Sequence, residues 1–214
     1  MRVPFNAPGR EVAELRSQID TAIADVLSSG WYVMGTQHAA FEGAFARYCG
    51  AAACLGVANG TDAIEIALRA LGCSAGDRVA CVANAGGYTT TACLAIGAIP
   101  VYVDVDDASL LMSPDALQAA LTSDFAAVVV THLYGRLAEM DEICRVAANC
   151  GVPVVEDCAQ SHGARRNGRH AGTFGQIGTF SFYPTKNLGA LGDGGALITE
   201  DPVLAARIRL LRQY

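Results

Sequence analysis

Short apolar runs alternate with amphipathic segments through most of this chain, and that rhythm limits what it can fold into. Apolar runs at 53–58, 78–83, 99–105, 126–131 and 153–157 predict buried strands, and segments at 61–71, 88–97, 114–121 and 138–149 predict helices between them. Such alternation is typical of a mostly parallel sheet that is covered by helices on both faces. We therefore expect an α/β fold.

The two ends of the chain depart from this rhythm. Before the first strand, residues 11–29 and 37–48 predict two helices. After residue 157, a loop rich in Gly and Arg precedes β-like runs at 177–182 and 195–199 and a helix from residue 202. This pattern predicts one domain over 1–214, with a helical segment over about 1–48 and an α/β core over about 49–214. The last helical pattern has no Gly or Pro stop before Tyr214, so we expect a domain truncated at its C-terminus.

Composition narrows the classes of partner. The formal net charge of −6 offers no basic surface to nucleic acid or to an anionic membrane. Apolar runs fall short of the roughly 18 residues that a membrane span needs, and the first residues do not open a signal peptide, so a cytoplasmic protein is expected. The eight cysteines include no CxxC pair, which favours buried free thiols over a metal site.

Lysine use is unusual, because Lys186 is the single lysine beside 14 arginines. A coding bias towards arginine explains most of this imbalance. However, a guanidinium cannot react with an aldehyde as a neutral primary amine does. Lys186 is therefore a candidate for amine chemistry, and the alternative is a solvated surface amine.

Three predicted strand ends carry groups that could bind a ligand, because ligands of open α/β sheets lie beyond the carboxyl ends of the strands. At the first, Gly60 and Thr61 open the helix of 61–71, where free amides and a hydroxyl could hold a phosphate. The alternative is an ordinary helix N-cap formed by Thr61 or Asp62.

At the second strand end, Asp157 closes a buried strand and needs a partner, since an unpaired buried charge is costly. A protonated pyridine nitrogen would serve, and the alternative is a structural salt bridge or a cap. Strand alternation points Glu156 the other way, which makes it the weaker candidate. Asp104, at the end of another strand, is a rival with less support.

The third marked segment surrounds Lys186 with small residues, which would let the backbone approach a flat ligand closely. Ser181 could add a second phosphate donor. Tyr88, which follows two glycines and opens a helix, could stack on an aromatic ring. Simple core packing is the alternative for Tyr88.

Four segments of the chain resemble one enzyme family: ANGTDAIEIALRALG, GYTTTACLAIGAIPVYVDVD, VVEDCAQSHGA and GTFSFYPTKNLGALGDGGALIT. They are similar to the DegT/StrS family of sugar aminotransferases that use pyridoxal 5'-phosphate (PLP). The resemblance runs from Phe5 to the last residue, and its lysine segment is the most specific part. Within the family, the chain looks most like enzymes that aminate nucleotide-linked 3-keto-6-deoxyhexoses.

This resemblance implies the large domain of a fold type I PLP enzyme, with the C-terminal small domain absent from this chain, and a homodimer. It implies a Schiff base and proton transfer at Lys186, a pyridine-nitrogen contact at Asp157 and a contact of Gln160 near the phenolic oxygen of the cofactor. The same resemblance implies phosphate contacts by Gly60, Thr61 and Ser181, and stacking by Tyr88. The implied reaction passes an amino group, usually from L-glutamate, to a keto-sugar nucleotide such as a dTDP-3-keto-6-deoxyhexose.

Other readings remain open. A catalytically incompetent fragment, or a non-catalytic folding or dimerisation module, is one of them, because relatives continue beyond the last residues of this chain. A cyclitol- or aminobenzoate-type PLP aminotransferase is another. Two further readings are disfavoured. Sugar dehydratases of the same fold resemble this chain but have histidine at position 186, so Lys186 argues against a dehydratase. A nicotinamide dehydrogenase is a poor fit, because no GxGxxG follows the first strand. We assign no role to Cys158, and we expect His162 to serve packing or loop hydrogen bonding.

Overall fold

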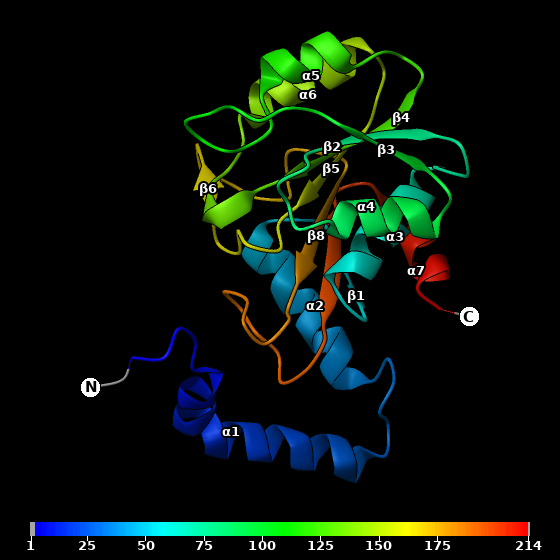
Figure 1. Cartoon of the computed structure of the whole chain (residues 1–214). Helices are drawn as coiled ribbons and strands as arrows, with labels where there is room; N and C mark the ends of the chain where they lie inside the picture. Colours follow the sequence, from blue (N-terminus) through cyan, green and yellow to red (C-terminus); the bar gives the residue numbers. More distant parts are fainter. Residues whose placement is uncertain (1–2, 214) are drawn as a thin grey trace.

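The computed structural model describes residues 3–213 and centres on a seven-stranded sheet (Figure 1). The strand order across the sheet is β1-β9-β8-β5-β4-β2-β3. Its strands are β1 Ala53–Val57, β2 Arg78–Cys81, β3 Ile99–Tyr102, β4 Phe125–Thr131, β5 Val154–Asp157, β8 Ile177–Ser181 and β9 Gly195–Thr199. The expectations for Met1, Arg2 and Tyr214 lie outside the described residues.

Strand direction is uniform except at β9. The neighbours from β8 across to β3 pair in parallel, whereas β9 pairs antiparallel with both β8 and β1. The predicted α/β fold with a mostly parallel sheet is therefore confirmed. All carboxyl ends except that of β9 meet at one edge, which is where ligands of such sheets bind.

The helices agree with the predicted segments to within a few residues. They are α1 Pro8–Ser29, α2 Thr36–Cys49, α3 Gly60–Ala70, α4 Tyr88–Ala95, α5 Pro114–Ala120, α6 Met140–Asn149 and α7 Pro202–Leu211, with a short 3-10 turn η1 at Leu133–Gly135. Polar N-caps begin three of them, since Asn59, Ser113 and Asp201 accept hydrogen bonds from amides of the first turns of α3, α5 and α7.

Three hydrophobic clusters pack on the sheet, and two of them show how its two faces are divided. Val129 and Val155 pack on one face with residues of α3, α4 and α7. Val128 and Val154, their neighbours along the strands, pack on the other face with residues of α5 and α6. This alternation follows from the two-residue period of a strand. It also assigns each polar residue at a strand end to a definite face.

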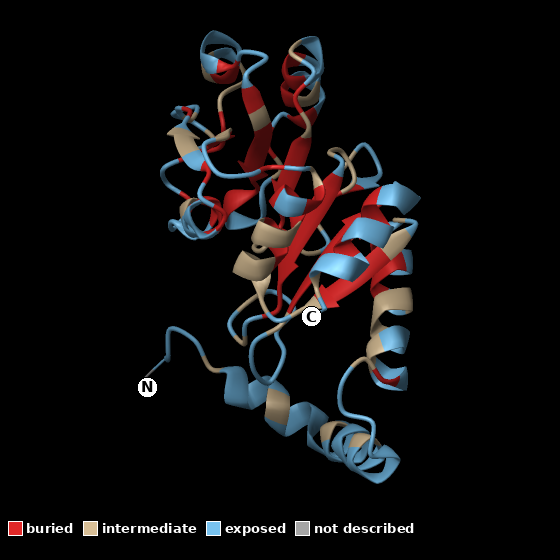
Figure 2. Cartoon of the chain, turned by 90° about the vertical axis from the view of Figure 1, so that its right-hand side faces the viewer, coloured by how far each residue is buried: buried red, intermediate tan, exposed pale blue. Residues whose placement is uncertain are grey.

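Helix α1 stands apart from this body. None of its residues is buried, and Figure 2 shows it as an almost wholly exposed rod beyond the sheet. Leu15 and Ile23, two of the apolar residues that stand at helical spacing in this segment, are exposed. Its extent was predicted well, because Gly30 ends it in the left-handed conformation (φ 64°).

Two features differ from the expectations. The predicted loop at 163–175 contains a hairpin of β6 Arg165–Arg166 and β7 Arg169–His170, which turns at Asn167 and Gly168 with φ 51° and 80°. Asn-Gly is a strong signal for such a two-residue turn. The last helix stops at Leu211, and Arg212 folds back to Glu42 and to the Gly56 carbonyl.

Among residues 3–213, no helix is both long enough and apolar enough to cross a membrane.

Candidate active site

A cavity of about 470 Å³ opens at the carboxyl edge of the sheet, on the face covered by α3. The start of α3, the start of α4 and the segment between β8 and β9 form its walls. Six of the predicted site residues line it: Gly60, Thr61, Tyr88, Asp157, Ser181 and Lys186. These residues come from four separate parts of the chain, so only the tertiary fold brings them together.

The start of α3 has the form of an anion cradle. Asn59 is the N-cap, with its side chain accepting from the amide of Asp62 at 2.9 Å. The predicted alternative, a cap formed by Thr61 or Asp62, is therefore wrong. A Cβ on Gly60 would lie 2.6 Å from the Cβ of Ser181, so only glycine permits this approach of α3 to β8. The approach brings the Ser181 hydroxyl next to the first amides of α3, which carry the positive end of the helix dipole.

Asp157 lies at the floor of the cavity and is only 4% exposed. One carboxylate oxygen accepts from the Ala159 amide at 3.1 Å, and the other accepts from the Thr131 hydroxyl at 3.3 Å. Burial raises the pKa of Asp157, while the Ala159 amide and the charge of Lys186 oppose that rise. Within the described chain no basic side chain forms an ion pair with Asp157, so a structural salt bridge does not explain its burial.

Lys186 lies on the connection between β8 and β9. The connection is fixed at its base, because the Phe182 amide donates to the Gly194 carbonyl and the Ala190 amide donates to the Phe182 carbonyl, both at 2.7 Å. The Lys186 side chain is partly buried and lines the cavity together with Asp157. The Lys186 side chain therefore faces a cavity that it shares with a buried carboxylate.

Tyr88 forms a side wall. Its ring is 52% exposed, which rules out the core-packing alternative. The Lys186 Nζ lies 5.9 Å from the centre of the ring, so a flat ligand could reach both groups. The Gly86–Gly87 turn supports the ring from one side, where a Cβ on Gly86 would lie 2.9 Å from a ring carbon.

Two other candidates lie elsewhere. Gln160 does not line the main cavity; it lies in an adjoining hollow beside Tyr134, and its side-chain oxygen accepts from the Tyr134 amide at 2.9 Å. Thr185 and Lys186 line both spaces, so they separate Gln160 from the main cavity. Asp104, the rival to Asp157, is exposed and caps its own turn by accepting from the Val105 amide.

Comparison with known proteins gives the family. Residues 13–214 match the DegT/DnrJ/EryC1/StrS aminotransferase family. The chain belongs to this family. The resemblance found in the sequence is thus confirmed.

Individual relatives agree with the family match. A dTDP-3-amino-3,4,6-trideoxy-alpha-D-glucose transaminase from Micromonospora megalomicea subsp. nigra is 46% identical over 93% of this chain and 53% of its own length. S. venezuelae DesV, solved in complex with a ketimine intermediate, is 43% identical with a TM-score of 0.96, over 100% of this chain and 57% of that one. NtdA from Bacillus subtilis, solved with bound cofactor PMP, is 33% identical with a TM-score of 0.90, over 97% of this chain and 47% of that one.

DesV and NtdA have the fold of type I PLP-dependent aminotransferases, and the predicted fold type is confirmed. The chain spans about half the length of the relatives it matches.

Sequence reasoning missed several lining residues of this family member. Asp193 had no predicted role and Asp62 was named only as a possible helix cap, yet both line the cavity with Tyr183 and Thr185. Thr131 was missed as the neighbour of Asp157. The sequence held a signal for it, because Thr131 is the polar residue that ends an otherwise apolar strand.

Glu156, next to Asp157 in sequence, points to the opposite face and is fully buried. One of its oxygens accepts from the amides of Phe174 and Gly175 at 2.6 and 2.7 Å. The other accepts from the Gly172 amide at 2.8 Å and from the His132 ring at 2.9 Å. The prediction that Glu156 points away from the site is confirmed, and the carboxylate ties the loop over 172–175 to the end of β5.

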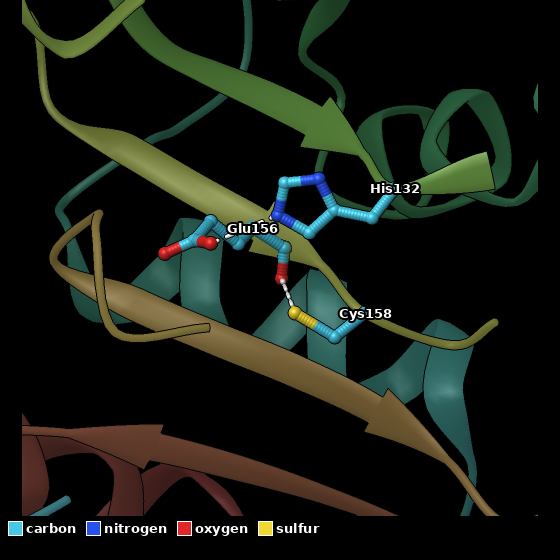
Figure 3. Close-up of side chains that lie close together, drawn as sticks. All are labelled: His132, Glu156 and Cys158. Carbon is cyan, nitrogen blue, oxygen red and sulfur yellow. Dashed lines mark hydrogen bonds and ion pairs between the residues drawn. The ribbon is translucent and has the colours of Figure 1, made fainter. Parts of the chain in front are cut away.

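His132, Glu156 and Cys158 lie close enough to hold a metal ion, but each polar atom is already engaged (Figure 3). The Ala138 amide donates to Nδ1 of His132, so Nε2 carries the ring proton and donates to Glu156. The Cys158 thiol donates to the Glu156 carbonyl, and burial holds its pKa well above the usual range. The cluster therefore acts as a hydrogen-bond network.

His162 packs against two aromatic rings, those of Phe180 and Phe182, with ring centres 5.5 Å away in both cases. The predicted packing role is confirmed. Burial lowers the pKa of His162 from 6.5 to about 4, because the charged imidazolium loses hydration there. His162 is therefore neutral in the folded protein near pH 7.

Replacing Glu156 by Gln should destabilise the fold. The Gln amide would turn an N–H group towards N–H donors, and we expect the free energy of unfolding to fall by about 3 kcal/mol in urea titrations. Glu142→Gln is the matched control, because Glu142 pairs with Arg145 on the exposed face of α6 and its loss should change stability by less than about 1 kcal/mol. Equal effects of the two substitutions would contradict the structural role of Glu156.

Acid should destabilise the protein partly through His162. Its folded pKa is depressed, so between about pH 6.5 and about pH 4 the unfolded chain takes up a proton that the folded chain does not, and stability falls as the pH falls. The free energy of unfolding should therefore decrease less in His162→Gln than in wild type between about pH 7 and about pH 5. The expected difference is about 1 kcal/mol, after allowance for the partial exposure of the His162 ring. Denaturant titrations at both pH values measure this difference, and parallel pH profiles of the two proteins would refute it. His170, whose pKa is also lowered, is retained in both.

Proposed function

We propose that residues 1–214 are the PLP-binding large domain of an aminotransferase that transfers an amino group from L-glutamate to a keto-sugar nucleotide. One observation carries this proposal: the single lysine, a buried carboxylate and an anion cradle line the same cavity. Lys186 and Asp157 are its proposed catalytic residues. The same proposal assigns the protein to the cytoplasm as a homodimer.

The cavity walls fit PLP at each of its polar groups. The first amides of α3, with Thr61 and Ser181, suit a phosphate, and the Gly60 position leaves the room that a Cβ would fill. Asp157 is buried without a cationic partner among residues 3–213, and a protonated pyridine nitrogen would supply one. Tyr88 presents a free ring face. The bound cofactor of NtdA supports the same reading.

When bound, PLP supplies a conjugated ring that accepts electron density from the carbon bearing nitrogen. Asp157 would hold the proton on the ring nitrogen through its negative charge, which keeps the ring electron-poor. Lys186 would bind the cofactor covalently through Nζ at rest. The same amine, once released, would act as the base that moves the α-proton of the amino donor.

Gln160 is proposed to contact the phenolic oxygen of the cofactor; its side-chain oxygen accepts from the Tyr134 amide, which leaves its NH2 group to donate. The amino acceptor is proposed from the relatives. A dTDP-amino-trideoxyhexose transaminase at 46% identity favours a 3-keto-6-deoxyhexose linked to dTDP. A panel of keto-sugar nucleotides and cyclitol ketones, assayed with the complete protein, tests this choice: amination of a cyclitol alone would overturn it.

Lys186 should be the only site of covalent cofactor attachment. Incubation with PLP followed by borohydride should fix the cofactor on wild-type chain, and mass spectrometry of peptides should find the label on Lys186. Neither Lys186→Ala nor Lys186→Arg should take the label. The arginine variant is the matched control, because it keeps the positive charge and lacks a reactive amine.

Covalent labelling of either variant at a side chain would contradict the assignment of Lys186. A wild-type chain that takes no label would contradict the proposed function as a whole, since then no amine in the cavity meets the aldehyde.

Asp157→Asn should separate cofactor binding from chemistry. The amide keeps the size of the side chain but cannot balance a pyridinium charge, so we expect retained PLP and a half-reaction with L-glutamate slowed at least about 100-fold. Stopped-flow absorbance of the bound cofactor in the complete protein measures the rate. A rate near that of wild type would remove Asp157 from the mechanism.

A further inference from the structure

Thr131 and Thr179 flank Asp157 in register on the two neighbouring strands. In the parallel pairing of β4 with β5, Thr131 is opposite Asp157, and in the pairing of β5 with β8, Thr179 is opposite Asp157. Both threonines are buried. Their hydroxyls nevertheless have different partners.

Only Thr131 contacts the carboxylate. Its Oγ1 donates to Oδ2 of Asp157 at 3.3 Å, whereas the Oγ1 of Thr179 donates to the main-chain carbonyl of Glu156 at 3.1 Å. The other carboxylate oxygen, Oδ1, accepts from the Ala159 amide. Each oxygen of Asp157 is thus held by one protein donor, which fixes the plane of the carboxylate within the cavity floor.

We propose that Thr131 is a positioning residue that keeps Asp157 ionised and aims it at the ring nitrogen of the cofactor. This inference rests on the proposed function. In a buried pair of carboxylate and pyridine, one proton is shared by two bases, and its location depends on their relative affinity for it. A hydroxyl that donates to the carboxylate lowers the proton affinity of Asp157, so the proton stays on the ring nitrogen.

The surroundings of Asp157 make the Thr131 hydroxyl important. Burial raises the pKa of Asp157, and the groups that oppose the rise are few: the Ala159 amide, Lys186, Thr131 and His132. Lys186 would no longer be a free ammonium group when it holds the cofactor. The Thr131 hydroxyl is neutral and fixed in the sheet, so its contribution would persist in that state.

The protonation of the ring nitrogen can be measured directly. PLP labelled with ¹⁵N in the ring, bound to the protein, gives separate NMR shifts for the protonated and neutral nitrogen. We expect Thr131→Val, which removes the hydroxyl and keeps the branched shape, to lower the pH at which the ring nitrogen loses its proton by about one unit. Thr131→Ser should restore the wild-type value.

Thr179→Val is the matched control, because it removes a buried hydroxyl beside Asp157 that does not touch the carboxylate. Its ring-nitrogen titration should follow that of wild type. If Thr131→Val does not fold, Thr131→Ala removes the same hydroxyl and is read in the same way.

A Thr131→Val or Thr131→Ala titration identical with that of wild type would overturn the inference, as would an equal shift in Thr179→Val. Wild-type protein that binds no PLP would instead overturn the proposed function. The two failures are therefore distinguishable from the same set of samples.

Discussion

The buried carboxylate of Glu156 is the interaction on which the rest of this site depends. It accepts four hydrogen bonds, three from amides of the loop over 172–175 and one from the His132 ring. A fully buried charge is stable only when such donors surround it. The carboxylate thereby joins the end of β5, the loop behind it and the turn after β4, and these are the elements that hold the floor of the cavity.

Adjacent residues of β5 have opposite tasks because a strand alternates its side chains between two faces. Glu156 faces the α5–α6 side and is satisfied by the protein, whereas Asp157 faces α3 and has only two protein donors. Asp157 thus keeps acceptor capacity that can face the cavity. The different surroundings of these two carboxylates therefore follow from the two-residue period of the strand.

Much of the fold could be predicted because its signals are local. Apolar runs and helical spacing gave the strands and helices, and Lys186 was recognisable as the single lysine within a glycine-rich segment. Contacts between distant segments were not predictable in this way. The bond from Thr131 to Asp157 joins strands 26 residues apart, and the placement of Gln160 depends on the Tyr134 amide. The hairpin at Asn167 had a local signal that the arginine-rich composition of its surroundings obscured.

The reversed direction of β9 has a consequence for how the amine moves. The connection that carries Lys186 leaves β8 and re-enters the sheet through β9, its immediate neighbour, so both ends are anchored in the core about one strand spacing apart. Bonds from Phe182 to Gly194 and from Ala190 to Phe182 close its base. With its backbone held at both ends, the Lys186 amine changes position by rotation about the single bonds of its own four-carbon side chain.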